Sequence, residues 1–390
     1  MAHFRAVLDW TDEDGETRSA LWRSESGAPL PTRVVVADDR IKADVAYRLA
    51  GAGTAILWRG DFPNARQLLA AMGRRVDRKR RVSVPSPELA FHQYRQTRAQ
   101  RARTLGMLLV PFDAGCVIPL RRAPDVRRAC VEAGCPTDEP FVISLRELLG
   151  IISAREWREK GVVIPALDAR IHPHYGVFSP VRGEYVDLVA TAPLPSLDST
   201  SDIGAAEIGA YDIGTGTGVL AALLARRGVG RVVATDQDTR ALTCARENVI
   251  RLGLTGQVDV VEADLFPDRG HDGGRVALVV CNPPWVPAKP SSPLEYAIYD
   301  PGSRMLRAFV GRLADHLQPG GEGWLVLSDF AEHVGLRTRK ELLTLFEDSG
   351  VDVAGRLDAK PRHPRASDHT DPLCVARAAE TTSLWRLTPQ

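Results

Sequence analysis

Residues 211–285 alternate apolar strands with helices, and this alternation constrains the fold more than any other feature of the chain. The stretch opens with YDIGTGTGVLAALLA, a short strand that runs into a glycine turn and then a helix. It ends with VVCNPPW, a buried strand that breaks into Asn282, Pro283, Pro284 and Trp285. Strands and helices in this order form a largely parallel sheet, which collects ligands at the carboxyl ends of its strands.

The same alternation continues to the end of the chain. We predict strands at 208–213, 231–235, 257–262, 275–281, 323–328, 351–357 and 383–387. We predict helices at 217–227, 239–253, 303–317 and 336–349. The sequence therefore indicates an α/β fold: a seven-stranded, Rossmann-like sheet with helices on both faces.

The remainder of the chain is expected to form a separate domain, because 390 residues exceed one ordinary core. We place an N-terminal α+β domain at 1–165 and the α/β domain at 166–390. Segments 3–10, 18–23 and 33–36 have strand character and are predicted to form a small meander. A helix is expected within RGDFPNARQLLAAMGRR, with Leu68, Leu69 and Met72 on one face, and Gly73 is predicted to end it.

Composition excludes several classes of protein. No apolar run approaches the ~20 residues of a membrane span, and the N-terminus has no signal-peptide pattern, so we expect a cytoplasmic protein without membrane contact. The six cysteines contain no CxxC pair. His172 and His174 form an HxH pair, but alternate residues on one strand face are more often structural, so we expect no metal.

Positive charge is concentrated between Arg66 and Arg103. This basic segment, 66–103, holds eleven Lys or Arg residues and two acidic residues. It is able to hold phosphate groups, although a solvated helix face and a basic loop would have the same composition. We expect a macromolecular substrate, protein or structured RNA, to dock on this segment and the N-terminal domain.

The glycine turn, residues 214–218, follows the first predicted strand of the α/β domain. Gly214 and Gly216 allow a tight turn whose backbone N–H groups approach a ligand, and Gly218 lets the helix start close to the sheet. A pyrophosphate-binding GxGxxG sequence requires glycine at 219, where this chain has Val219.

Two acidic residues end the next two predicted strands. Asp236 is placed to accept hydrogen bonds from both hydroxyls of a ribose. Asp264 is placed to accept an exocyclic N–H, with Leu265 and Phe266 as apolar cover for an adenine ring. An isolated Asp is more often a helix cap or turn residue, but groups that fit at three successive strand ends indicate a cofactor site.

The Asn-Pro-Pro-Trp sequence suits a planar nitrogen acceptor. Such a nitrogen is a weak nucleophile because its lone pair is delocalised into the neighbouring π system. The Asn282 side-chain oxygen and the Pro283 carbonyl could each accept one N–H and aim that lone pair at a methyl group. Pro283 and Pro284 stiffen the segment, and Trp285 could stack on a flat acceptor. A Pro-Pro turn that simply ends a strand is the structural alternative.

Together these motifs resemble class I S-adenosylmethionine-dependent methyltransferases, specifically the small-domain group with an NPP-aromatic motif. The resemblance covers about 176–330 and implies S-adenosylmethionine as the cofactor. By resemblance, Asp212 and the glycine turn would hold the methionine part, Asp236 the ribose and Asp264 the adenine. The implied cofactor-binding residues are Asp212, Gly214, Thr215, Gly216, Gly218, Asp236, Gln237, Asp264, Leu265 and Asn282. The implied catalytic residues are Asn282, Pro283, Pro284 and Trp285.

The acceptor remains open between two related groups. DIGTGTGVLA and NPPW are similar to HemK-type protein glutamine N5-methyltransferases, although the preceding IHPHYGVFSPVRGEY lacks their PRPETE-like run. Its GVFS is more like the ribosomal-RNA guanine N2-methyltransferases. A glutamine side chain is our first expectation and an rRNA or tRNA base the alternative. A small-molecule methyltransferase and a non-catalytic RNA-binding protein with a retained cofactor fold are further alternatives.

Overall fold

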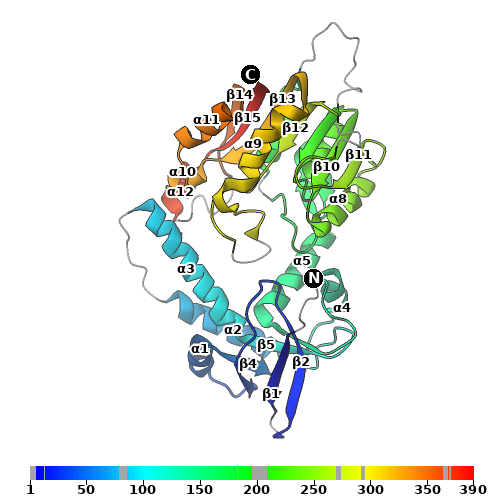
Figure 1. Cartoon of the computed structure of the whole chain (residues 1–390). Helices are drawn as coiled ribbons and strands as arrows, with labels where there is room; N and C mark the ends of the chain where they lie inside the picture. Colours follow the sequence, from blue (N-terminus) through cyan, green and yellow to red (C-terminus); the bar gives the residue numbers. More distant parts are fainter. Residues whose placement is uncertain are drawn as a thin grey trace. The chain divides into compact units, whose positions relative to one another are not determined.

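The computed structural model describes residues 6–12, 14–78, 86–181, 183–195, 209–268, 274–290, 295–362, 368 and 370–390. It divides into two compact units, which are described separately. The first unit is drawn mainly from Met1–Val84 and His92–Glu156, and the second mainly from Trp157–Pro290 and Leu294–Gln390. Figure 1 shows a sheet with helices in each unit.

The first unit contains a six-stranded sheet of order β1-β2-β6-β5-β4-β3. Its strands are β1 (Val7–Thr11), β2 (Thr17–Arg23), β3 (Arg33–Ala37), β4 (Thr54–Trp58), β5 (Leu108–Phe112) and β6 (Phe141–Ser144). The helices are α1 (Ala43–Gly51), α2 (Phe62–Asp77), α3 (Pro87–Gly106), α4 (Arg127–Glu132) and α5 (Leu145–Lys160). The unit boundary falls within α3 and α5.

The predicted N-terminal meander is wrong. Strands β1 and β2 form an antiparallel pair, but β2 then pairs in parallel with β6, which lies more than a hundred residues later in the chain. Strand β3 is at the opposite edge and pairs in parallel with β4, with α1 as the crossover. Two parallel neighbouring strands must be joined by a crossover such as α1. Strands that follow one another in the sequence are therefore not all neighbours in this sheet.

Gly73 does not end the helix that contains it. Helix α2 continues to Asp77, and Gly73 is buried within it. A Cβ at this position would lie 3.3 Å from an Arg101 guanidinium nitrogen and 3.9 Å from Leu105 Cδ1. The missing side chain therefore allows α3 to pack closely against α2, and this outweighs the low helix propensity of glycine.

The second unit contains a seven-stranded sheet of order β11-β10-β9-β12-β13-β15-β14. Its strands are β9 (Gly209–Ile213), β10 (Arg231–Asp236), β11 (Val258–Glu262), β12 (Val276–Cys281), β13 (Leu317–Ser328), β14 (Val351–Ala359) and β15 (Thr382–Pro389). Each predicted strand of the α/β domain corresponds to one of these. Strands β9 to β13 are all parallel to one another, whereas β15 is antiparallel to both of its neighbours, β13 and β14.

Helices cover both faces of this sheet. The larger ones are α6 (Glu184–Thr191), α7 (Val219–Arg226), α8 (Thr239–Arg251), α9 (Arg304–His316) and α11 (Arg339–Asp348). Short elements are α10 (Phe330–His333), α12 (Cys374–Ala379), the 3-10 helices η1 (Pro165–Leu167) and η4 (Pro301–Ser303), and the strand pair β7 (Val162–Ile164) and β8 (Ala169–Ile171). One core cluster includes α6 and α7, and another includes α9 and α11 (Figure 1).

In the described part of the chain, no helix is both long enough and apolar enough to cross a membrane.

Candidate functional site

The glycine turn has the left-handed backbone that the sequence predicted. Gly214, Gly216 and Gly218 have φ values of +72°, +55° and +80°. The N–H groups of Gly214 and Thr215 donate to Thr235 O of β10 at 2.9 and 2.8 Å, which fixes the turn to the neighbouring strand. A Cβ on Gly216 would meet nothing within 4 Å, so backbone at this point is open to a ligand.

Asp212 supports the turn from beneath. It is 1% exposed, and its Oδ2 accepts hydrogen bonds from Thr215 Oγ1 at 2.6 Å and from Ala221 N at 2.9 Å. Burial raises the pKa of Asp212 to about 6 despite these two hydrogen bonds, and the charge of Asp236 acts in the same direction. A cation near this carboxylate would relieve the cost of its burial.

Asp236 ends β10 and reaches the same turn. Its Oδ2 accepts from Gly216 N at 3.0 Å and its Oδ1 from Asp238 N at 3.0 Å. Burial raises its pKa, and the backbone hydrogen bonds oppose that shift. Gln237 follows as an exposed residue. Asp236 therefore links two strand ends, and its oxygens face the region where the turn is open.

The segment after β11 contains Asp264 and Leu265, which the sequence predicts near an adenine, and Phe266, which belongs to the core. Asp264 is exposed, and Leu265 is half-buried with a left-handed φ of +74°. Thr235 Oγ1 donates to Leu265 O at 2.5 Å and holds this strained residue in place. Asp264 and Leu265 thus lie beside β10, in the order along the sheet edge that the sequence indicated.

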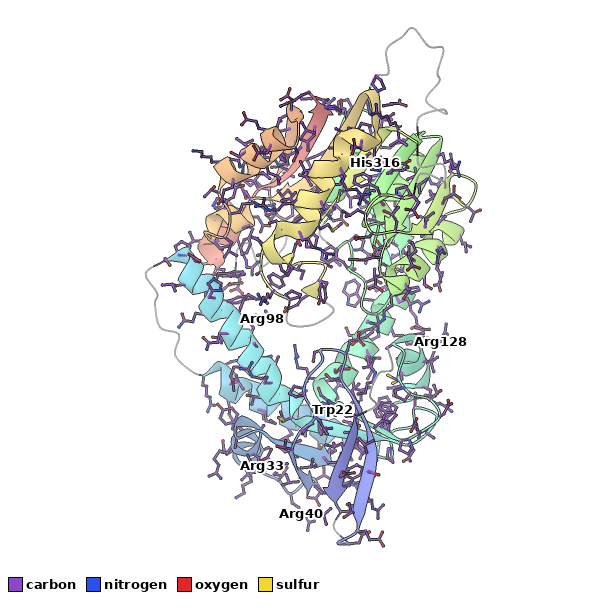
Figure 2. The ribbon with its side chains drawn as sticks, in the orientation of Figure 1. Trp22, Arg33, Arg40, Arg98, Arg128 and His316 are labelled. Atoms are coloured by element: carbon purple, nitrogen blue, oxygen red, sulfur yellow. The ribbon has the colours of Figure 1, made fainter. Side chains whose placement is uncertain are left out.

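Phe266 does not provide apolar cover for a ligand, and that prediction is wrong. It is 3% exposed and stacks on the His316 ring of α9, with centroids 3.9 Å apart and an interplanar angle of 15°. Phe309 stacks on it at 6.0 Å. Figure 2 labels His316 on α9. The side chain is part of a core cluster that includes residues of the sheet and of α9, where burial of its apolar ring is favourable.

The Asn-Pro-Pro-Trp segment directly follows Cys281, the last residue of β12. The Trp285 indole N–H donates to Asn282 Oδ1 at 2.9 Å. Pro283 is buried, while Asn282, Pro284 and Trp285 are half-buried. The indole therefore fixes the orientation of the Asn282 amide, a relationship that the sequence analysis did not include.

A loop that the sequence analysis did not assign to the site also reaches the glycine turn. Asp300 is 6% exposed, and its Oδ2 accepts from Met305 N at 2.8 Å and Leu306 N at 3.3 Å, at the start of α9. The Met305 methyl carbon lies 2.7 Å from where a Cβ on Gly214 would be. An acidic residue just before Pro-Gly and a helix is a capping signal that could have indicated this loop.

The HxH pair has protein partners. His172 Nδ1 lies 2.7 Å from Arg158 O, and His174 Nε2 lies 2.9 Å from Glu247 Oε2. No group of three potential metal ligands occurs among the described residues. The Asn248 side chain donates to His172 O at 3.3 Å and to Thr217 O at 3.0 Å, which joins this lead-in segment to the glycine turn.

The sequence of residues 360–365, with four Lys, Arg or His side chains, is compatible with either an ordinary loop or a substrate lid. Lys360 Nζ donates to Ala379 O at 3.0 Å and to Thr381 Oγ1 at 2.9 Å, and Arg362 forms an ion pair with Asp187 at 3.3 Å. Residues 363 and 365 lie outside the described part of the chain.

The glycine turn follows β9, and the ends of β10, β11 and β12 lie along the same edge of the sheet. The residues that the sequence predicts to bind a nucleoside cofactor and a nitrogen acceptor are on this edge. A largely parallel sheet of this order, with a glycine turn after its first strand, is an arrangement found in S-adenosylmethionine-dependent methyltransferase domains. Residues 168–348, a little under half of the chain, match the family model described as "Methyltransferase small domain".

Several curated relatives are named as methyltransferases of ribosomal protein L11 or of release factor glutamine. A ribosomal protein L11 methyltransferase of Pelotomaculum thermopropionicum is 49% identical over 72 residues, which is 18% of this chain and 22% of the relative. A release factor glutamine methyltransferase of Cereibacter sphaeroides is 31% identical over 166 residues, which is 39% of this chain and 56% of the relative. The chain thus spans about a fifth of the first relative and about half of the second.

Among solved structures, a ribosomal protein L11 methylase of Lactobacillus delbrueckii subsp. bulgaricus is 16% identical, with a TM-score of 0.31. The match covers 47% of this chain and 70% of that chain. A likeness at this level carries no argument about function.

Proposed function

We propose that the protein is an S-adenosylmethionine-dependent N-methyltransferase that acts on a planar amide or amine nitrogen of a macromolecule. When bound, S-adenosylmethionine supplies a methyl group on a positively charged sulfur. The residues present suit this cofactor: the turn at Gly216 is open to a ligand, and two carboxylates with raised pKa values, the buried Asp212 and the half-buried Asp236, lie beside it. Asp236 would hold the ribose and Asp264 the adenine.

The observation that carries this proposal is the hydrogen bond from Trp285 Nε1 to Asn282 Oδ1. An amide oxygen has two lone pairs, so Asn282 can accept a second hydrogen bond, from an acceptor N–H, in an orientation that Trp285 has already fixed. The Pro283 carbonyl would accept the second N–H. The nitrogen lone pair would then point toward the donor side of the site, and this orientation supplies much of the rate enhancement.

This geometry changes the role proposed for Trp285. Its indole N–H is directed to Asn282, and its ring also packs against the two core clusters of the second unit. Its part in catalysis is therefore to position Asn282, and any stacking on the acceptor would use the part of the ring that remains exposed.

A glutamine side chain of a protein is our first choice of acceptor. The amide of glutamine has two N–H donors on a planar nitrogen, which matches the two oxygens of Asn282 and Pro283. Relatives named release factor glutamine methyltransferase, including one of Moorella thermoacetica at 32% identity over 167 residues, support this choice. The relatives named for ribosomal protein L11 leave another protein acceptor open.

A base of rRNA or tRNA is the second candidate, because arginines gather in the first unit. Desolvation, together with the like charges of Arg101 and Arg98, lowers the pKa of Arg146. Arg98 and Arg101 lie on α3, within the basic segment, and Arg146 lies on α5 (Figure 2 labels Arg98). Phosphate groups would relieve this repulsion. We propose that the N-terminal domain recognises the substrate and that 66–103 contributes to docking; residues 79–85 of this segment lie outside the described residues.

The deciding experiment uses the lysate of a strain that lacks the gene, incubated with purified protein and S-adenosylmethionine labelled in its methyl group. Separate samples are then digested with ribonuclease or protease. Label that survives ribonuclease but not protease supports a protein acceptor, and the reverse pattern supports RNA. Label in small soluble molecules would overturn the macromolecular proposal, and no transfer to any fraction would contradict the activity itself.

A further inference from the structure

Glu184 is a buried carboxylate that the proposed site does not yet use. It is the first residue of α6 and is 3% exposed. Its Oε1 is shielded from solvent and has no hydrogen-bond partner among the described residues. An ionised carboxylate oxygen in such surroundings is unfavourable unless a cation or a donor meets it, so the atom indicates a ligand.

The packing of α6 places Glu184 near the glycine turn. Helix α6 packs on α7 within one core cluster, through Tyr185 and Val189. Arg227, which caps the end of α7, donates to Val189 O at 2.6 Å and to Ala192 O at 2.5 Å, just where α6 ends. The two helices are of equal length, eight residues each, and their carboxyl ends lie together. Helix α7 starts directly after the glycine turn.

Tyr185 gives independent support for this placement. The residue is 3% exposed, and its pKa is raised by burial, then by the charge of Asp212 and then by that of Glu184. Charges shift a pKa in this way only over short distances. Asp212 and Glu184 therefore flank one tyrosine, beneath and beside the turn.

We propose that Glu184 binds the α-ammonium group of the methionine part of S-adenosylmethionine. This inference rests on the proposed function. Asp212 Oδ2 already accepts from Thr215 and Ala221, whereas Glu184 Oε1 has its lone pairs available. An ammonium group has three hydrogen-bond donors and a positive charge. It would therefore donate a hydrogen bond to the buried carboxylate and also neutralise its charge. Glu184 would thus recognise the amino-acid end of the cofactor, which the adenosine-binding residues do not reach.

The test compares two ligands by calorimetry. S-adenosylmethionine contains the ammonium group, whereas 5′-methylthioadenosine has the same nucleoside and a thioether but no amino-acid part. In Glu184→Gln, which keeps the shape of the side chain, we expect affinity for S-adenosylmethionine to fall about tenfold to a hundredfold. Affinity for 5′-methylthioadenosine should stay within about twofold of wild type.

Asp187→Asn is the matched control, because it removes a carboxylate from the same helix at a half-buried position, where the side chain pairs with Arg362; both affinities should be unchanged. Glu184→Asp keeps the charge and should recover part of the loss. Wild-type affinity of Glu184→Gln for S-adenosylmethionine would overturn the assignment, as would an equal loss for both ligands, which means a structural role. If the wild-type protein itself binds no S-adenosylmethionine, the proposed function is contradicted. The two failures are distinguishable, because the assignment of Glu184 is tested by the difference between the variant and the wild type.

Discussion

Trp285 donates its indole N–H to Asn282 Oδ1 at 2.9 Å, so the aromatic residue of the motif holds its amide residue in one orientation. Trp285→Phe removes this donor and keeps most of the ring. Because a neutral hydrogen bond contributes about 0.5–1.5 kcal/mol, kcat should fall roughly twofold to tenfold while cofactor affinity is retained. Label transfer into the substrate fraction measures the first and calorimetry the second. Trp157→Phe, at an exposed tryptophan, is the control and should behave as wild type; an unchanged kcat in Trp285→Phe would remove the positioning role.

Asn282→Ala tests the acceptor model directly. The variant loses an oxygen proposed to orient the acceptor nitrogen in the transition state, so kcat should fall by about 10²–10³-fold. Binding of S-adenosylmethionine should remain, because the glycine turn and Asp236 are unchanged. The same two assays measure both effects. Full activity in this variant would refute the acceptor model, and loss of cofactor binding would place Asn282 primarily in the cofactor site.

Asp236→Ala should weaken binding of S-adenosylmethionine by about tenfold to a hundredfold, because it removes a charged acceptor proposed for the ribose. It also removes the acceptor for Gly216 N, so part of the loss would come from the turn. Calorimetry measures the affinity. Asp259→Ala, at an exposed aspartate of β11 that pairs with Arg231, should leave it unchanged. Equal affinity of wild type and Asp236→Ala would remove the ribose assignment.

Local signals predicted the second unit well. Each of its seven strands corresponds to a predicted one, and the glycine turn, Asp236, Asp264 and Asn282 all lie at strand ends. This succeeded because buried parallel strands are continuous apolar runs and because turns need glycine or a polar residue. In the first unit the pairing of β2 with β6 depends on contacts far apart in sequence, which no local pattern contains.

Side-chain partners were less predictable than backbone positions. Phe266 follows two candidate ligand residues in sequence, yet it stacks on His316 from α9. Asp300 lies at the start of α9, whose Met305 contacts the glycine turn, and Glu184 is buried at the start of α6. The burial of these two carboxylates depends on tertiary packing, which the local sequence does not contain.

Gly218→Ala should destabilise the protein more than Gly228→Ala, a matched change at the other end of α7. Both glycines have positive φ, +80° and +92°, where alanine is strained by about 1–2 kcal/mol. Only at 218 would the new Cβ meet a neighbour closely, with Ala245 Cα and Cβ at 3.3 Å. We expect losses in unfolding free energy of about 2–4 kcal/mol for Gly218→Ala and about 1–2 kcal/mol for Gly228→Ala. Denaturant titration measures both, and equal losses would show that contact with Ala245 is unimportant.

Binding of S-adenosylmethionine should release protons near pH 6 but not near pH 8. Burial raises the pKa of Asp212 to about 6, so in the free protein this carboxyl is partly protonated at pH 6. A cationic ligand favours the ionised carboxylate and lowers that pKa, which expels the proton; at pH 8 the group is ionised in both states. The pKa of Asp236 is also raised, and its effect has the same sign.

Calorimetry in two buffers of different ionisation enthalpy gives the number of protons exchanged. The uncharged 5′-methylthioadenosine should release fewer, and proton uptake with S-adenosylmethionine at pH 6 would contradict a cation bound beside Asp212.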